Sequence, residues 1–309
     1  MVRYLTIDGG TTNTRICLVE DGRVTDTLRL SVGARLAAGN GELLKTGVRD
    51  GIRTLLERNG LTEGDIRQII ASCMITCEYG LCHLPHISAP AGLRELHDSA
   101  AAVSLPEISP IPFTFIRGVK LAGERAETTD MMRGEETELI GLGRREGAMY
   151  VLPGSHSKLI ATDEAGRITD FTTMLTGEML AALSSGTILK DAVSLEGTQL
   201  DEAYLLRGCR CCRERGLNEA LFKVRILKNL YGANRDQTYS FFLGAVLWGE
   251  IGSIPAKHPK SLVIGGKKQL QQAMAVLLRE LTDIPVTQVS AREAEEAPAL
   301  GAVRIFEGE

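Results

Sequence analysis

The sequence lacks three features that would each indicate a particular class of protein. It has no uninterrupted apolar run long enough to cross a membrane, so we expect no membrane partner. Its formal net charge is only −4, which gives no basic signature for binding nucleic acid. Its seven cysteines contain no two matching C-x-x-C motifs, the spacing that most strongly predicts structural zinc. No secretory leader precedes the first apolar segment, so we expect a cytoplasmic protein with reduced thiols.

The chain of 309 residues is long enough for two domains with separate cores, and its 44% hydrophobic content is ordinary for a globular protein. Residues 4–30 are similar to residues 148–174 without a gap, so that Gly10 corresponds to Gly154 and Thr11 to Ser155. Each copy reads as a strand, a turn with glycine and a hydroxyl, a second strand, a charged glycine turn and a third strand. A repeat of this length indicates two similar domains.

The remaining apolar patterns complete the predicted fold class, an α/β protein of two duplicated βββαβα domains that flank a central cleft, with mixed sheets. The domains would be 1–145 and 146–309, with the last helix packing back on the first domain. Strands are expected at 67–75, 261–266 and 285–289. Helices are expected at 41–59, 91–102, 133–143, 176–194, 217–254 and 269–281, with a short one at 295–306.

The first candidate site is the loop that follows the first strand. Gly9 and Gly10 let backbone N–H groups approach an anion, and Thr11 and Thr12 add hydroxyl donors. Asp8 would repel a phosphate but suits Mg²⁺ bound between phosphates. The alternative is a tight hairpin in which the glycines serve only geometry.

The second candidate loop occupies the same place in the second copy and has no carboxylate, because Leu152 corresponds to Asp8. It consists of Gly154, Ser155, His156, Ser157 and Lys158. Lys158 is a candidate cation for phosphate. His156 is either a donor to a ligand or an ordinary polar loop residue.

Two further segments carry candidate residues. Gly265 and Gly266 end a strand and would let a flat group such as adenine lie against the backbone, although G-x-G-x-x-G is absent and a plain turn is the alternative. The polar run 130–137 offers carboxylates to deprotonate an acceptor hydroxyl, and Arg133 to bind a carboxylate. The alternative is a solvated helix start, where acidic residues are favoured.

Four segments make the chain resemble the 2-dehydro-3-deoxygalactonokinase family, which has the actin-like ATPase fold of sugar kinases. These segments are MRGEETELIG (132–141), LPGSHSKLI (152–160), FTTMLTGEML (171–180) and ALFKVRIL (220–227). The resemblance covers almost the whole chain. It implies phosphorylation of a 2-keto-3-deoxy sugar acid at its terminal hydroxyl, with ATP and Mg²⁺ as cofactors.

The resemblance also implies roles for individual residues. Asp8 to Thr12 would hold phosphates and metal, and Gly154 to Lys158 would form the second phosphate loop. Glu135 or Glu136 would lie near the acceptor hydroxyl, and we select Glu135 as the catalytic base. Arg133, Glu136 and Glu78 would contact the substrate, together with Thr176, Gly177 and Glu178 at a helix start.

The chain departs from the family pattern at two places. Gly9 stands where the family has Trp in D-W-G-T-T, and Glu78 stands where the family has Arg in G-M-I-G-S-R-x-G-W. If that Arg binds the substrate carboxylate, the inverted charge alters the preferred acid. A kinase for another polyol and a non-kinase ATPase that activates a partner protein are the alternative functions. The oligomeric state is left open, with a homo-oligomer among the options.

Overall fold

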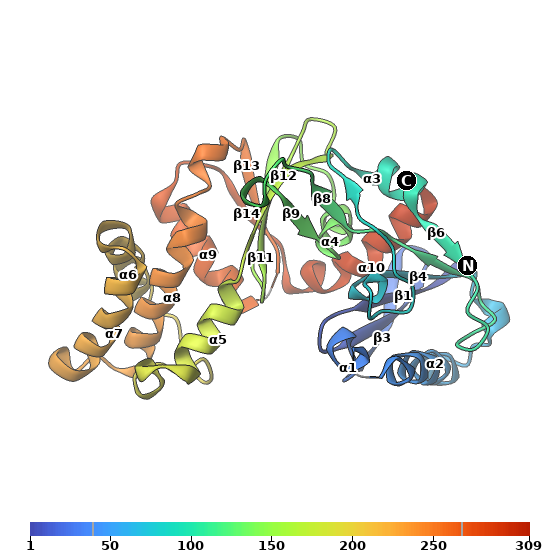
Figure 1. The fold of residues 1–309 in the computed structure, drawn as a ribbon, viewed down its shortest axis with the longest axis horizontal. Coiled ribbons are helices and arrows are strands. Elements are labelled where there is room, and N and C mark those ends of the chain that lie inside the picture. The colour runs from blue at the N-terminus through green and yellow to red at the C-terminus, as the bar shows by residue number, and fades with distance from the viewer. Residues whose placement is uncertain (39, 267) are drawn as a thin grey trace. The chain divides into compact units, whose positions relative to one another are not determined.

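Two units, each built around its own mixed sheet, make up the computed structural model, which describes residues 1–38, 40–266 and 268–309 (Figure 1). Unit 1 consists of Met1–Arg145, Asp163–Asp170 and Ser290–Glu309, and unit 2 of Glu146–Thr162 and Phe171–Val289. The C-terminal segment therefore belongs to the first unit, and the two units are described separately.

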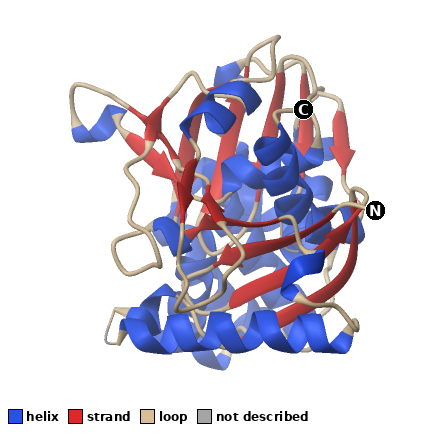
Figure 2. Cartoon of the chain, turned by 90° about the vertical axis from the view of Figure 1, so that its right-hand side faces the viewer, coloured by secondary structure: helices blue, strands red, loops and turns tan. Residues whose placement is uncertain are grey.

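The sheet of unit 1 has six strands in the order β3-β2-β1-β4-β7-β6. Figure 2 draws the strands of the chain in red and the helices in blue. Antiparallel pairing joins β1 to β2 and β2 to β3, whereas β1, β4 and β7 run parallel. The strands are β1 (Arg3–Gly9), β2 (Thr14–Glu20), β3 (Arg23–Leu30), β4 (Gln68–Cys73), β6 (Ala101–Val103) and β7 (Phe113–Phe115), and a small second sheet holds β5 (Ile87–Ser88), β8 (Val119–Leu121) and β9 (Asp130–Met132). Since β1 and β4 are parallel neighbours, their C-terminal residues meet at one edge of the sheet.

Helix α2 (Gly41–Arg58) covers the sheet of unit 1, as its apolar periodicity predicts. Asn40 caps its N-terminus by accepting from the Glu42 N–H at 3.1 Å. Leu44, Val48 and Ile52 lie on its buried face and share one apolar core with the strands.

The other helices of unit 1 are α1 (Ala34–Ala37), α3 (Leu93–Ser99), α4 (Glu135–Leu142) and α10 (Ala291–Glu307). The prediction of a short helix at 295–306 is wrong, because α10 has 17 residues. Its start is fixed by a capping box of Ser290 and Glu293, and Pro298 is accommodated inside the helix. It packs closely on α4, where a Cβ on Gly141 would lie 1.8 Å from the Ala297 carbonyl oxygen.

The sheet of unit 2 repeats the strand arrangement, with the order β12-β11-β10-β13-β14. The strands are β10 (Ala148–Leu152), β11 (Ser157–Thr162), β12 (Ile168–Met174), β13 (Ser261–Ile264) and β14 (Val286–Gln288). Strand β10 is antiparallel to β11 and parallel to β13, as β1 is to β2 and β4. The two halves of the sequence repeat thus form equivalent hairpins.

The helices of unit 2 are α5 (Thr176–Gly186), α6 (Glu202–Arg215), α7 (Leu217–Tyr231), α8 (Arg235–Ile251) and α9 (Lys268–Leu281). The prediction of one helix over 176–194 is wrong: α5 ends at Gly186, and the Thr187 hydroxyl then caps a short 3₁₀ turn. The predicted helical stretch 217–254 is divided by Gly232, whose φ of 63° ends α7. Helix α6 was not predicted.

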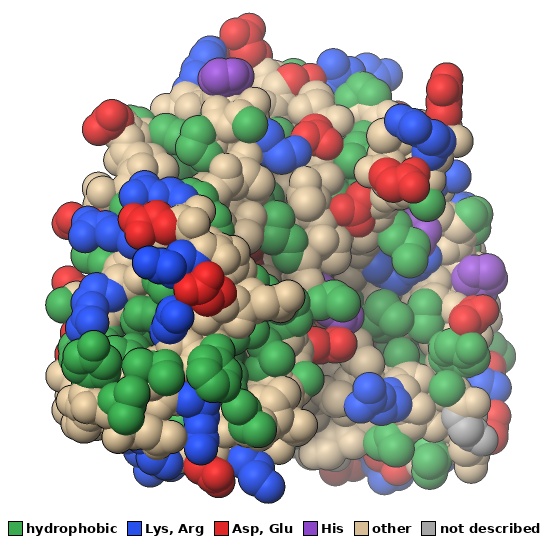
Figure 3. Space-filling view, turned by 60° about the vertical axis from the view of Figure 1, so that its left-hand side comes forward, with side chains coloured by type: hydrophobic (Ala, Val, Ile, Leu, Met, Phe, Trp, Pro, Cys, Tyr) green, Lys and Arg blue, Asp and Glu red, His purple; other side chains and the backbone are tan. Residues whose placement is uncertain are grey.

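Within the ranges that the structure describes, no helix is long and apolar enough to cross a bilayer. Some large apolar side chains are nevertheless exposed, among them Phe222, Leu230 and Tyr231 on α7. Hydrophobic side chains gather at the lower left of the view in Figure 3.

Candidate functional site

The first loop is a tight turn that is docked on the start of α1. The Gly10 N–H donates to the Asn13 carbonyl at 2.8 Å, and the Ala34 and Arg35 N–H groups donate to the carbonyls of Gly10 and Thr11 at 3.1 and 2.9 Å. Gly33 allows this approach, because a Cβ there would lie 2.6 Å from the Gly10 oxygen. Thr11 is exposed, as is Thr12, so both hydroxyls are available to a ligand.

Asp8 ends β1 and is paired with a residue that the sequence did not single out. Its Oδ2 accepts from Arg15 Nη2 at 2.9 Å, and Arg15 also donates to the Glu295 carbonyl at 2.8 Å. The two side chains meet because Asp8 and Arg15 are opposite each other in the β1–β2 hairpin. The register of that hairpin could have been derived from its turn in the sequence. It would have placed Arg15 opposite Asp8.

The second loop repeats this construction against α5. The Gly177 N–H donates to the Ser155 carbonyl at 3.1 Å, and a Cβ on Gly177 would lie 2.5 Å from the Gly154 oxygen. Gly177 occupies in the second copy the place of Gly33 in the first. The repeat therefore extends from the strands to the glycine at which each loop meets a helix, beyond the segment in which the sequences correspond.

The side chains of the second loop separate into exposed and buried members. Ser155 and His156 are exposed, and His156 Nε2 lies 3.0 Å from Glu178 Oε1. Ser157 and Lys158 are buried, with Lys158 only 4% exposed. The role of Lys158 as a phosphate cation stays a prediction.

The glycine pair after β13 lies directly against the entry to the second loop. The Gly265 N–H donates to the Val151 carbonyl at 3.0 Å. Gly266 has a φ of 74°, and a Cβ there would lie 2.4 Å from the Pro153 oxygen. Gly266 is thus a close-approach glycine beside the second loop, and the neighbouring Lys267 lies outside the described residues.

Three of the carboxylates that the sequence predicts as site residues raise the pKa of one thiol in unit 1, that of Cys73. Cys73 ends β4 opposite Gly9, and a Cβ on Gly134 would lie 2.7 Å from its Sγ. Burial raises the pKa of the Cys73 thiol, and the charges of Asp8, Glu135 and Glu136 raise it further. The ends of β1 and β4 and the start of α4 therefore bring these carboxylates to one place.

Cys73 has a backbone conformation that suits glycine, with a φ of 70° and a ψ of −147°. Gly9 is buried beside the next turn, where a Cβ would lie 2.8 Å from Ile75 Cβ. The backbone at position 9 has therefore no room for a larger side chain in this conformation.

The two adjacent glutamates at the start of α4 have different surroundings. Glu136 is fully buried and accepts from the Gly134 N–H at 2.8 and 2.9 Å and from the Thr137 hydroxyl at 3.1 Å. Burial raises the pKa of Glu136 to about 8, and the neighbouring charge of Glu135 adds to the effect. Glu135 is only half-buried and accepts from the Arg133 N–H at 3.1 Å. Glu135 is thus the better placed of the two to reach a substrate.

Arg133 holds the start of α4 to the segment 76–86. Its Nη1 donates to the Thr76 carbonyl at 2.9 Å and its Nη2 donates to the Leu84 carbonyl at 3.1 Å. A substrate carboxylate would compete with these bonds, so the predicted substrate contact stays a prediction. Glu78 lies in the same segment and is exposed.

In unit 2 the predicted residue Thr176 is buried and bonded to a glutamate that the sequence did not reveal. Its hydroxyl donates to Oε1 of Glu250, which lies on α8 and is 1% exposed. Both residues line a cavity of about 530 Å³ whose walls include Met179, Leu217 and Trp248. Glu250 is far from Thr176 in the sequence, and no local pattern marked it.

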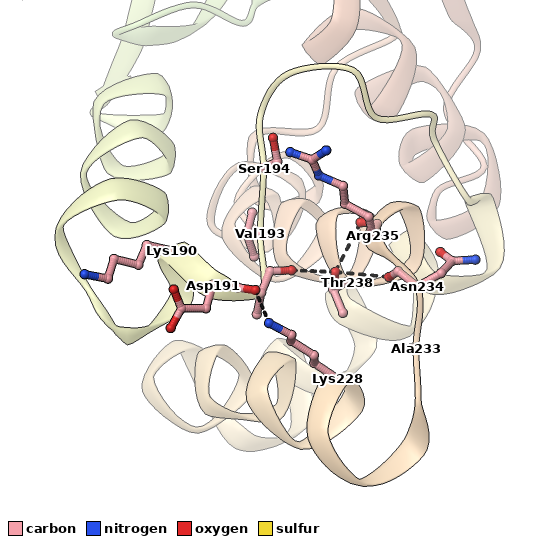
Figure 4. A pocket seen from close by; sticks show the side chains of 10 residues that line it. Lys190, Asp191, Val193, Ser194, Lys228, Ala233, Asn234, Arg235 and Thr238 are labelled. Atoms are coloured by element: carbon pink, nitrogen blue, oxygen red, sulfur yellow. Dashed lines mark hydrogen bonds between the residues drawn. The ribbon is translucent and has the colours of Figure 1, made fainter.

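A second cavity of unit 2, of about 360 Å³, is shown in Figure 4. Lys228 donates to the Asp191 carbonyl, and the Thr238 hydroxyl donates to the Ala192 carbonyl at 2.6 Å. Lys190 and Arg235 also line it. None of the residues predicted from the sequence lines this cavity.

The residues present suit Mg²⁺ only as a partly hydrated ion. Among the described residues, no group of three or more His, Cys, Asp or Glu could hold a metal ion. Mg²⁺ in phosphate-transferring sites is commonly held by one or two carboxylates, water and the phosphates themselves. Asp8, about a third exposed at the end of β1, fits that arrangement.

The duplicated hairpins with their glycine-hydroxyl loops define the class of protein, a sugar kinase of the actin-like ATPase fold. A crystal structure from Sinorhizobium meliloti, named as a 2-dehydro-3-deoxygalactonokinase, has a TM-score of 0.79 at 24% identity and covers 97% of this chain and 96% of its own. An activator of 2-hydroxyisocaproyl-CoA dehydratase from Clostridium difficile, solved with ADPNP, covers 99% of this chain and 96% of its own at a TM-score of 0.53 and 11% identity. These likenesses show the fold.

The sequence comparisons identify the family. The family model for 2-keto-3-deoxy-galactonokinase matches residues 8–304, and the chain belongs to this family of kinases. A 2-dehydro-3-deoxygalactonokinase from Escherichia coli is 25% identical over 91% of this chain and 92% of its own length. A relative from Rhizobium meliloti named for the same activity is 29% identical over 96% and 94%. The resemblance is thereby confirmed, and the chain is a kinase.

Proposed function

We propose that this kinase transfers the γ-phosphate of ATP to the terminal hydroxyl of a 2-keto-3-deoxy sugar acid, with 2-dehydro-3-deoxygalactonate as the first candidate. The observation that carries the proposal is the set of carboxylates around Cys73, beside an exposed hydroxyl loop. The names of the two curated relatives support the choice of acid.

In this proposal the first loop supplies the metal and phosphate contacts. Asp8 would hold Mg²⁺, and the hydroxyls of Thr11 and Thr12 would donate to phosphate oxygens. When bound, Mg²⁺ would neutralise charge on the phosphates. Arg15 would hold the Asp8 carboxylate in position through their bond of 2.9 Å.

Glu135 is the proposed base for the acceptor hydroxyl. It would orient the hydroxyl and take its proton as the oxygen forms a bond to the γ-phosphorus and ADP leaves. Glu136, buried and bonded to Gly134, would support the helix start instead of contacting the substrate. Arg133, which is bonded to the segment 76–86, and Glu78 within that segment would lie near the acid end of the substrate.

The second loop would bind the nucleotide. Backbone N–H groups and hydroxyls at Gly154 to Ser157, with Lys158, would hold phosphate oxygens, and Gly265 with Gly266 would allow adenine to approach the backbone. Thr176, Gly177 and Glu178 would shape the helix start against which this loop is docked. The setting proposed for the reaction is the cytoplasm.

The test is ADP release from ATP and Mg²⁺ with a panel of sugar acids. We expect release that depends on an acceptor, and fastest with a 2-keto-3-deoxy acid. A different acid at the top of the panel would change the proposed substrate. ADP release without any acceptor dependence would instead favour the alternative of an ATPase that activates a partner.

Asp8→Asn is the matched variant for the mechanism. It keeps the size of the side chain but removes the charge that faces the metal, so turnover should fall by about three orders of magnitude or more. Asp21→Asn, in the exposed turn between β2 and β3, is the control and should leave turnover unchanged. Near wild-type turnover in Asp8→Asn would remove Asp8 from the mechanism.

A further inference from the structure

Glu250 is the most deeply buried acid of unit 2 that the proposed mechanism does not use. It lies near the C-terminal end of α8, it is 1% exposed, and its Oε1 accepts from the Thr176 hydroxyl. Its Oε2 is a buried oxygen with no hydrogen-bond partner among the described residues. A buried carboxyl oxygen without a hydrogen-bond partner is energetically unfavourable, so the presence of Glu250 at this position needs an explanation.

The contacts of Glu250 lead directly to the second loop. Thr176 is the first residue of α5, and the next residue, Gly177, donates its N–H to the Ser155 carbonyl. Burial raises the pKa of Glu250, and the Thr176 and Ser157 hydroxyls act in the opposite direction. The Ser157 hydroxyl in turn accepts from the Gly154 N–H at 3.3 Å. The acid is therefore bonded to the first residue of α5, the helix against which the loop is docked.

The first copy of the repeat holds its loop in a different way. There the Thr14 hydroxyl donates to the Val32 carbonyl at 2.7 Å, and Val32 occupies the place that Thr176 has in the second copy. That connection lies within the loop's own hairpin and the segment that follows it. In the second copy the corresponding connection is made by a side chain from α8, which is distant in the sequence.

We propose that Glu250 is a positioning residue that fixes the conformation of the second loop through Thr176 and the start of α5, and so sets the affinity for the nucleotide's phosphates. The inference rests on the proposed function of that loop. In this proposal α8 holds the start of α5 from the cavity that Glu250 and Thr176 line, whereas Ser155 and His156 are exposed.

The experiment measures ADP binding by titration calorimetry and steady-state constants for ATP and for the sugar acid. Glu250→Leu removes the acceptor, whereas Glu250→Gln keeps an oxygen for the Thr176 hydroxyl. Thr176→Val removes the hydroxyl that donates this hydrogen bond, whereas Thr176→Ser keeps a hydroxyl at the same position. Trp248 is the chain's only tryptophan and lines the same cavity, so an unchanged emission spectrum shows that the region is intact.

We expect Glu250→Leu and Thr176→Val each to weaken ADP binding and raise the KM for ATP about tenfold, as for one lost buried hydrogen bond, with the KM for the acid within about twofold. Glu250→Gln and Thr176→Ser should restore most of the affinity. The double variant Glu250→Leu/Thr176→Val should be no worse than either single variant, because both remove one connection.

Two results would overturn the inference. One is ADP affinity in Glu250→Leu or Thr176→Val equal to that of the wild type. The other is an equal loss for ATP and for the sugar acid, since that is the result of general destabilisation. If Glu250→Leu does not fold, the Thr176→Val and Thr176→Ser pair decides alone. Absence of ADP binding in the wild type would reject the proposed function itself, which is a separate outcome.

Discussion

Replacing Glu136 by Gln should make the protein more stable at alkaline pH and leave it almost unchanged at acidic pH. The carboxyl is wholly buried, and its pKa is raised from 4.5 to about 8 by burial and by the charge of Glu135. At pH values between these two, the folded state keeps this proton and the unfolded state releases it. The contribution of Glu136 to stability is therefore fully present below pH 4.5 and is lost as the pH rises through about 8.

The size of the effect follows from the same shift. A difference of this size between the folded and unfolded pKa values corresponds to ~5 kcal/mol of lost stability at pH 9 relative to pH 4. An amide at position 136 carries no titrating proton. Its oxygen can still accept from the Gly134 N–H and the Thr137 hydroxyl, which both reach Oε1 in the wild type. The gain from Glu136→Gln should thus grow by about 1.4 kcal/mol per pH unit between these limits.

The assay is urea unfolding followed by circular dichroism at pH 5, 7 and 9, for the wild type, for Glu136→Gln and for Glu57→Gln. Glu57 is exposed on α2 and controls for the loss of one carboxylate. The free energy of unfolding of Glu136→Gln relative to the wild type should increase with pH, while Glu57→Gln should follow the wild type. Parallel pH profiles for the wild type and Glu136→Gln would refute the reasoning.

Three other predictions follow from the positions of single residues. Cys73→Gly should be more stable than Cys73→Ala by about 1 kcal/mol in urea unfolding, the reverse of the usual order, because position 73 has a φ of 70°; a less stable glycine variant would show that the strain is not there. Glu78→Arg should raise kcat/KM for 2-dehydro-3-deoxygalactonate about tenfold, by a charge-assisted contact with its carboxylate; an unchanged value would place Glu78 outside the site. Gly33→Ala and Gly177→Ala should each weaken ADP binding, because a Cβ at either position would lie within 2.6 Å of the adjoining loop oxygen, and wild-type affinity in both would contradict loop docking.

The sequence determined the duplicated hairpins and their loops, because these features depend on neighbouring residues. Short, nearly continuous apolar runs specify the central strands, and Gly10 and Gly154, each followed by a hydroxyl residue, mark the turns after them. The family could be recognised for the same reason, since its motifs are short continuous segments such as residues 132–141. Each of these features depends on residues that are close together in the sequence, so it can be recognised without knowledge of the fold.

The lengths of the helices were harder to predict from the sequence, because apolar periodicity and capping groups give competing signals of similar strength. Helix α5 ends at Gly186, where the Thr187 hydroxyl offers a cap that an apolar pattern does not record. Helix α10 begins earlier than its apolar face, at the capping box of Ser290. Both errors come from weighing periodicity above capping groups that are worth about 1 kcal/mol.

Tertiary structure alone decided which side chains act together. Asp8, Cys73 and Glu135 are separated by more than sixty residues at each step, and parallel pairing of β1 with β4 and the docking of α4 bring them to one place. Glu250 meets Thr176 only because α8 packs in unit 2 beside the start of α5. A raised pKa, such as that of Glu136, likewise depends on desolvation by residues distant in the chain. Burial and charge at a site are sums over neighbours in space, and a linear sequence specifies only neighbours along the chain.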